Sequence, residues 1–160
     1  MTEQVQTLRI MTTQAYADAF RALNEEWIST LFTLEEKDRV TLGDPQRTIV
    51  DPGGQVYVFE SDGVVVGCAA LIAFGDGVYE LSKMAVSPTM RGQGTGRRLL
   101  LYVLQQVRGL GARMVFLASS TRLKNAVHLY ESVGFHHVAP GRLPELKYAR
   151  ADVFMKMELA

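Results

Sequence analysis

Apolar residues recur every three or four positions in several segments, which is the spacing of one face of an α-helix. This spacing within residues 15–32 is followed by Phe20, Leu23, Trp27, Ile28 and Leu31. We expect helices in the segments 15–32, 34–42, 99–110 and 122–133. Within the third of these, one stripe combines Leu99, Leu100, Val103, Leu104, Val107 and Leu110.

Other segments are continuously apolar or alternate between apolar and polar residues, which is typical of β-strands. We expect strands over 8–12, 55–61, 64–74, 78–87, 113–119, 135–138 and 152–159. The predicted order is β-α-α-β-β-β-α-β-α-β-β, which indicates an α/β (α+β) fold with a mixed sheet and helices on its faces. Alternation along 78–87 places Tyr79, Leu81 and Lys83 on one face of the sheet, and Glu80, Ser82 and Met84 on the other.

Composition limits the kinds of partner. The 160 residues carry 17 Lys+Arg and 17 Asp+Glu, so the net charge is zero, and nothing favours nucleic acid or an anionic membrane as a partner. The length fits one domain, residues 1–160. A single cysteine and an N-terminus unlike a leader favour a cytoplasmic protein.

The segment MRGQGTGRRLL, residues 90–100, is an unusual way to begin a helix. Arginines near a helix N-terminus oppose the positive end of the helix dipole, and glycines cost about 1 kcal/mol each relative to alanine. A phosphate bound on free backbone amides would offset both costs. The segment fits neither G-x-G-x-x-G nor G-x-x-x-x-G-K-[ST], so NAD and ATP are disfavoured. It does fit [Q/R]-x-x-G-x-[G/A], through Arg91, Gly94 and Gly96.

Two segments together resemble the GNAT superfamily of acetyl-CoA-dependent N-acetyltransferases. Residues 80–100, ELSKMAVSPTMRGQGTGRRLL, are similar to its pyrophosphate-binding motif and the strand before it. Residues 125–135, NAVHLYESVGF, are similar to the motif that follows, although Ala126 directly follows Asn125 here. The resemblance implies a mostly antiparallel central sheet with helices on both faces and a splayed strand pair that holds CoA.

The resemblance also implies which residues bind the acetyl-CoA cosubstrate. Backbone amides would hold the pyrophosphate, and the segment that carries them consists of Arg91, Gly92, Gln93, Gly94, Thr95 and Gly96, with Arg97 at its edge. The backbone of Met84, Ala85 and Val86 would pair with pantetheine, and an amide there would stabilise the oxyanion. Asn125 would hydrogen-bond the pantetheine arm, although asparagine is also common at helix starts.

Two side chains are candidates for proton transfer. The resemblance gives Tyr130 the role of general acid toward the CoA thiolate, against the alternative of a core tyrosine. Glu80 is the candidate general base, because family members often place an acid on this strand. The alternative for Glu80 is an ion pair with Lys83 or an arginine.

Other chemistry-bearing residues have simpler explanations. Cys68 lies in an apolar strand and is expected to behave as a small hydrophobe. The three histidines show no metal-ligand spacing, so we expect no metal. The acids of the first two predicted helices are Glu25, Glu26, Glu35, Glu36 and Asp38. They would either recognise a cationic amine or form solvated helix faces.

The resemblance implies acetyl transfer to an amine by direct attack in a ternary complex. The acceptor is left open between a small primary amine and the amine of a peptide or protein, because fold and cofactor site do not fix it. The alternative function is a non-catalytic acyl-CoA-binding sensor, and a nucleotide-binding regulator is disfavoured by the failed motifs. Many similar proteins are dimers, so a homodimer is among the assemblies that the resemblance allows.

Overall fold

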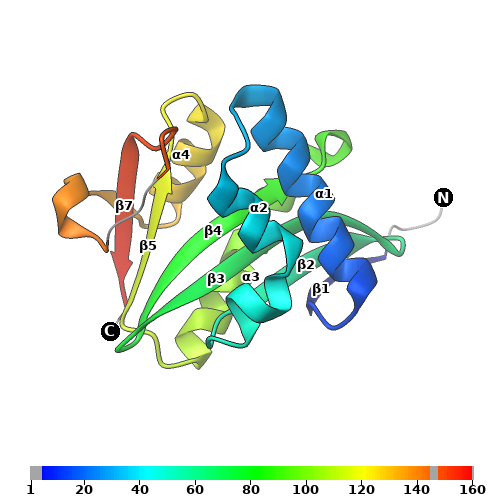
Figure 1. Ribbon diagram of the computed structural model, residues 1–160, viewed down its shortest axis with the longest axis horizontal. Coiled ribbons are helices and arrows are strands. Elements are labelled where there is room, and N and C mark those ends of the chain that lie inside the picture. The colour runs from blue at the N-terminus through cyan, green and yellow to red at the C-terminus, as the bar shows by residue number, and fades with distance from the viewer. Residues whose placement is uncertain (1–4, 145–147, 160) are drawn as a thin grey trace.

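The computed structural model describes residues 5–144 and 148–159, which form a seven-stranded sheet covered by helices (Figure 1). The strands are β1 (Gln6–Ile10), β2 (Gln55–Ser61), β3 (Val64–Gly75), β4 (Val78–Val86), β5 (Met114–Ser119), β6 (His136–His137) and β7 (Val153–Glu158). Their spatial order is β1-β2-β3-β4-β5-β7-β6. Every neighbouring pair is antiparallel except β4 and β5, which are parallel. The predicted mixed, mostly antiparallel sheet is confirmed.

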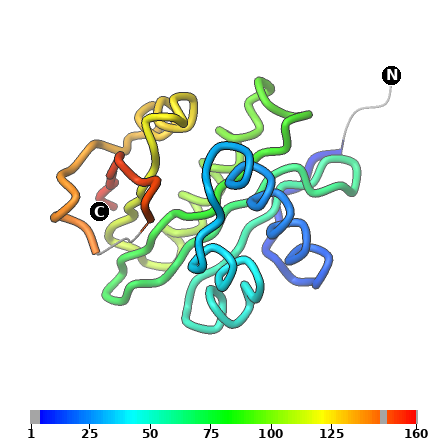
Figure 2. The backbone as a smooth tube through the Cα atoms, turned by 45° about the horizontal axis from the view of Figure 1, so that its top comes forward, coloured from blue at the N-terminus to red at the C-terminus, as the bar shows by residue number. Residues whose placement is uncertain are grey.

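Helices cover both faces of this sheet (Figures 1 and 2). Helices α1 (Gln14–Leu31) and α2 (Glu36–Gly43) pack on one face, together with a π-helical turn, Gln46–Val50, that the sequence pattern did not predict. Helices α3 (Thr95–Gly109) and α4 (Lys124–Ser132) pack on the other face. Two short 3₁₀ turns, Pro88–Met90 and Pro140–Arg142, complete the order. The predicted succession of strands and α-helices is confirmed.

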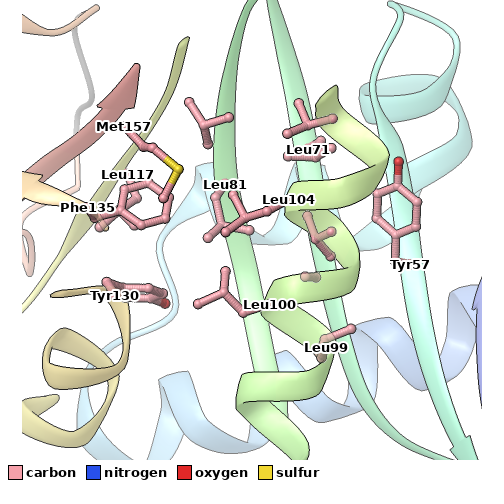
Figure 3. Packing of buried hydrophobic residues seen from close by; sticks show 14 of the residues in the cluster. Tyr57, Leu71, Leu81, Leu99, Leu100, Leu104, Leu117, Tyr130, Phe135 and Met157 are labelled. Atoms are coloured by element: carbon pink, nitrogen blue, oxygen red, sulfur yellow. The ribbon is translucent and has the colours of Figure 1, made fainter. Parts of the chain in front are cut away.

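The apolar stripe of α3 supplies much of the larger core cluster, which Figure 3 shows from close by. Leu99, Leu100 and Leu104 are fully buried against β3, β4 and β5 in this cluster. Leu110 was expected to share the stripe, but it is 51% exposed because the helix ends at Gly109 and Leu110 is its C-cap. On the other face, Thr13 caps α1 by accepting a hydrogen bond from the Tyr16 amide at 3.2 Å.

Several element boundaries differ from the prediction. The first strand lies at Gln6–Ile10 instead of 8–12, and the strand predicted over 135–138 shortens to His136–His137. Both lie at or near the sheet margins, where few neighbours fix the ends of a strand. The loop predicted over 139–151 includes residues 145–147, which lie outside the described residues.

A β-bulge in β4 changes which side chains share a face. Ala70 pairs with Ser82 and Cys68 pairs with Ala85, so one extra residue is accommodated on β4. Lys83 occupies the bulge with a φ of +53°, which is uncommon for a residue other than glycine. The predicted placement of Lys83 with Leu81 is therefore wrong. Lys83 points instead to the α2 side of the sheet, where it binds Asp38. Met84, predicted to share the face of Glu80, packs instead with Leu81 in the larger core cluster.

Candidate active site

The strands β4 and β5 separate halfway along their length. Their parallel pairing covers Val78, Tyr79 and Glu80 on β4 and ends there, while β5 continues to pair with β7 as far as Ser119. The second half of β4, which includes Met84, Ala85 and Val86, consequently has an open backbone edge toward β5. The predicted splayed strand pair is confirmed, and the three residues expected to bind pantetheine line the split.

The split opens into a continuous cavity of about 790 Å³. Its lining includes β4 from Glu80 to Val86, the start of α3, the end of β5 and the inner side of α4. The end of α1 and the segment before β7 contribute Trp27, Leu31, Tyr148 and Arg150. This one cavity therefore joins the glycine-rich segment to the candidate proton-transfer residues.

The glycine-rich segment presents unpaired amides at the start of α3. Within the described chain, the amides of 92–97 donate to no carbonyl or side chain, and the first bond into α3 runs from the Arg98 amide to the Gly94 oxygen. Gly92 and Gly94 have φ values of +80° and +76°, and a Cβ at either would meet open space. A Cβ at Gly96 would meet Leu129 and Val86 at ordinary van der Waals distances. The glycines at 92 and 94 thus serve the backbone turn.

The side chains of this segment differ in their contacts and in their burial. Arg91 lies 3.7 Å from the Glu26 carboxylate of α1, and Arg97 donates to the Ser132 hydroxyl at 3.0 Å. Gln93 donates to the Thr89 carbonyl at 3.3 Å, and it is exposed. The Thr95 side chain turns inward, and its buried hydroxyl has no partner among the described residues. The backbone amide of Thr95 is one of the free amides of the segment.

Helix α4 places Asn125 and Tyr130 on the cavity. Asn125 is exposed on the first turn, and Tyr130 is buried, with its ring against Phe135 at a centroid distance of 5.9 Å (Figure 3). Burial raises the pKa of Tyr130 to about 12. The described residues give its hydroxyl no hydrogen-bond partner, and the residue lines the cavity. Tyr130 therefore stays protonated at neutral pH and keeps a proton to donate.

Glu80 is the last β4 residue before the split. It is 5% exposed, lines the cavity and forms no ion pair or hydrogen bond through its side chain with any described residue. Burial raises the pKa of Glu80 to about 7, against the opposing charges of Lys83 and Lys37. The carboxyl is thus poised to exchange a proton near neutral pH. The alternative of a direct ion pair with Lys83 does not occur, because the Lys83 ammonium binds elsewhere.

The partner of Lys83 is Asp38 of α2, at 2.6 Å between Nζ and a carboxylate oxygen. Asp38 is fully buried and also accepts two hydrogen bonds from the Arg150 guanidinium, at 2.9 and 2.7 Å. The amide of Glu35 adds a fourth at 2.9 Å. Burial alone would raise the pKa of Asp38, but the bonds from Arg150 and Lys83 outweigh it and hold the pKa well below its usual range. Asp38 is therefore ionised, and its carboxylate is saturated with hydrogen bonds.

The same network fixes the segment before β7. The Tyr148 hydroxyl accepts a hydrogen bond from Lys83 at 3.2 Å, and the Lys83 and Arg150 cations each lie 4.5 Å from the centre of the Tyr148 ring. Glu35 accepts from the Ala149 amide at 3.3 Å and from Arg150 at 3.4 Å. Tyr148 and Arg150 are site residues that sequence reasoning missed, because they lie more than 100 positions from Asp38 and belong to no motif.

The acids proposed for cation recognition are mostly engaged in other interactions. Asp38 and Glu35 bind Arg150, Glu25 binds Arg21 at 2.6 Å, and Glu26 and Glu36 face Arg91 and Arg39. Cys68 is completely buried, and burial raises its pKa to about 12, as expected for a small hydrophobe. Within residues 5–144 and 148–159, no three His, Cys, Asp or Glu side chains gather as metal ligands. No helix in this part of the chain could span a membrane.

Comparisons with known proteins agree with this arrangement. The model of the acetyltransferase (GNAT) family matches residues 13–135. The chain is 30% identical over 143 residues to the uncharacterized N-acetyltransferase YjgM of Escherichia coli (strain K12), covering 84% of each protein.

Solved structures share the fold. A GNAT-family acetyltransferase from Staphylococcus aureus Mu50 has a TM-score of 0.88 at 19% identity, covering 98% of this chain and 100% of that one. The acetyltransferase yncA from Salmonella typhimurium, solved with its cofactor acetyl-CoA, has a TM-score of 0.73 at 22% identity, covering 97% and 94%. At these identities the likeness establishes the fold alone.

The Asp38 network predicts a large loss of stability on removal of its negative charge. Asp38→Asn leaves Lys83 and Arg150 without their shared anion, and we expect the free energy of unfolding to fall by about 3–5 kcal/mol. Urea unfolding followed by circular dichroism measures the change. The double variant Asp38→Asn/Lys83→Met removes one buried cation as well and should recover part of the loss. A loss below about 1 kcal/mol for Asp38→Asn would contradict this account of the network.

Proposed function

The chain belongs to the acetyltransferase (GNAT) family and is an N-acetyltransferase, and we propose that it moves the acetyl group of acetyl-CoA to a primary amine by direct attack within a ternary complex. The observation that carries the proposal is that Glu80 and Tyr130 line one cavity with the split between β4 and β5. Neither side chain has a polar partner among the described residues, so both remain available for proton transfer.

The free amides of 92–97 support binding of the acetyl-CoA pyrophosphate. They form an anion-binding arrangement at the start of α3, and Arg91 and Arg97 flank it. The open edge at Met84, Ala85 and Val86 is suited to pairing with the amide groups of pantetheine. Asn125 faces the same cavity from α4 and would add a hydrogen bond to that arm. When bound, acetyl-CoA supplies the activated acetyl thioester.

The proposed reaction needs two proton transfers by this chain. Glu80 in its carboxylate form takes a proton from the acceptor ammonium, which frees the nitrogen lone pair for attack on the thioester carbonyl carbon. A backbone amide of Met84, Ala85 or Val86 would stabilise the oxyanion that forms. As the carbon–sulfur bond breaks, Tyr130 donates its phenolic proton to the departing thiolate. The nitrogen loses a further proton, which restores the Tyr130 phenol, and Glu80 releases to solvent the proton that it took. The products are an N-acetyl amine, CoA and one proton.

We further propose that the chain acts as one domain in the cytoplasm on a small-molecule, peptide or protein amine, without nucleic acid or membrane as a partner. The zero net charge supports the absence of a polyanionic partner, and the single buried cysteine fits a reducing compartment. A homodimer stays a prediction. The alternative function, a non-catalytic acyl-CoA sensor, would require no proton donor at Tyr130.

Gly94→Ala should weaken acetyl-CoA binding. A left-handed backbone costs a residue with a Cβ about 1–2 kcal/mol, which favours distortion of the turn that aligns the amides. We expect the dissociation constant from calorimetry to rise about tenfold. Gly109→Ala is the matched control, because it has open space around its Cβ and no positive φ. Equal affinity for acetyl-CoA in the two variants would refute the proposed cradle.

Glu80→Gln should lower kcat by about 10²–10⁴-fold, since the amide cannot accept the proton. In the unmodified protein, kcat/KM should rise with pH through an ionisation near 7, because only the carboxylate form is a base. That ionisation should be missing from the profile of the variant. Persistence of the same ionisation in Glu80→Gln would assign it to another group.

Tyr130→Phe should lower kcat by about 10²-fold or more while the affinity for acetyl-CoA stays unchanged. The hydroxyl has no partner among the described residues, so its removal should not reduce the thermal stability of the protein. Tyr102→Phe serves as the control, because Tyr102 packs on Tyr57 away from the cavity. Unchanged turnover in Tyr130→Phe would eliminate the general-acid assignment.

A further inference from the structure

The fold does not determine which amine accepts the acetyl group. The residues at the end of the cavity near α1 indicate the chemistry of that acceptor. We call this end the acceptor mouth, defined by Trp27 and Leu31 of α1, Arg122 between β5 and α4, and Tyr148 and Arg150 before β7. In Figure 1 the end of α1 and helix α4 both lie at the top of the view. The mouth combines an apolar, aromatic wall with two guanidinium groups.

The two guanidinium groups differ in what they bind. Arg150 is half-buried and its charge is met by Asp38 and Glu35. Arg122 is exposed and lies over the Phe32 ring at 4.7 Å, while that ring meets Trp27 edge to face at 6.2 Å. No carboxylate in the described part of the chain lies within 4.0 Å of Arg122. Arg122 therefore keeps its donors for a ligand while its position is fixed by an aromatic surface.

Arg122 also lies apart from the phosphate-binding segment. Arg91, at that segment, contacts α1 through Glu26, whereas Arg122 contacts Phe32 at the C-cap of the same helix. Six residues of helix correspond to about 9 Å along its axis. The two arginines therefore face different parts of the cavity, and the pyrophosphate at 92–97 does not account for Arg122.

Among the described residues, Arg122 is the charged group of the acceptor mouth that has no ion pair, and Glu80 is the unpaired acid deeper in the cavity. Lys83 and Arg150 share Asp38, so neither cation nor carboxylate of that network is available to a substrate. Glu80 is a buried carboxyl without a partner among the described residues, and Arg122 is an exposed cation at the mouth whose charge no described carboxylate meets. Among the described residues that line the cavity, a polyamine or other polycation would meet a single carboxylate and a guanidinium that repels it. An acceptor with one ammonium and one anion would satisfy both groups.

We propose that the acceptor is a small amine that also carries an anionic group, such as the carboxylate of an amino acid, and that Arg122 binds this group while Glu80 faces the amine. This proposal rests on the proposed function, whose base it uses. Arg122 is accordingly a specificity-determining residue, with planar donors suited to bidentate binding of a carboxylate. The apolar wall of Trp27 and Leu31 would accommodate the carbon skeleton.

The test compares acceptors that differ only in charge. CoA release is measured with leucine, phenylalanine, β-alanine and 4-aminobutyrate, each beside its carboxamide, and 2-aminoethylphosphonate distinguishes a phosphonate from a carboxylate. We expect the anionic member of at least one pair to have a kcat/KM about tenfold or more higher, because the neutral carboxamide loses the charge-assisted hydrogen bonds to Arg122. Equal values within every pair would overturn the proposal.

Arg122→Met removes the charge and retains an aliphatic contact with Phe32. This variant should lose the preference mainly through KM, with kcat and the dissociation constant of acetyl-CoA within about twofold, whereas Arg122→Lys should retain part of it. The control is Arg39→Met, because Arg39 pairs with Glu36 on the surface of α2 and does not line the cavity. A preference that survives in Arg122→Met would assign recognition to another residue and overturn the proposal.

A separate readout keeps this proposal distinguishable from the proposed function. Binding of the same compounds to the protein saturated with CoA is measured by calorimetry. Binding of the anionic members that depends on Arg122, without turnover of any amine, would support the proposal and contradict catalysis. Turnover that is indifferent to the anionic group would support catalysis and contradict the proposal. Absence of both binding and turnover would overturn the proposal.

Discussion

The buried carboxylate of Asp38 is the interaction on which the acceptor side of the molecule depends. A fully buried carboxylate is costly unless hydrogen bonds and opposite charges surround it, and here Lys83, Arg150 and the Glu35 amide supply four bonds. These bonds join α2 to the bulge of β4 and to the segment before β7. One side chain thereby fixes the position of two neighbouring walls of the cavity.

Two acids on the same side of the sheet consequently have opposite properties. Asp38 accepts hydrogen bonds from four donors and stays ionised, whereas Glu80 has no donor among the described residues and burial raises its pKa to about 7. By binding Asp38, Lys83 leaves Glu80 free for proton exchange while its charge still moderates the Glu80 pKa. Asp38 thus has a structural role, whereas Glu80 keeps the free carboxyl that the proposed base requires, and Arg122 is the cation at the mouth that no described carboxylate pairs with.

Sequence reasoning was effective where the signal is local and limited where it is long-range. The glycines at 92 and 94 predict a turn with exposed amides, because such a turn depends only on the local backbone conformation. The structure has that turn. The apolar periodicities predicted the order of the elements for the same reason. Strand alternation misplaced Lys83, because a bulge depends on pairing with β3 and is not encoded in the alternation of β4 itself. The contact between Asp38 and Arg150 joins residues 112 positions apart and had no local signal.

The central claim is that one cavity brings an acetyl thioester and an amine together beside Glu80 and Tyr130. The most direct measurement is calorimetric titration of the protein with acetyl-CoA, followed in the same preparation by release of free thiol in the presence of an amine panel. The account predicts saturable binding and thiol release that requires an acceptor. Binding without release for any amine would contradict the catalytic claim, and absence of binding would contradict the assignment of the amides at 92–97.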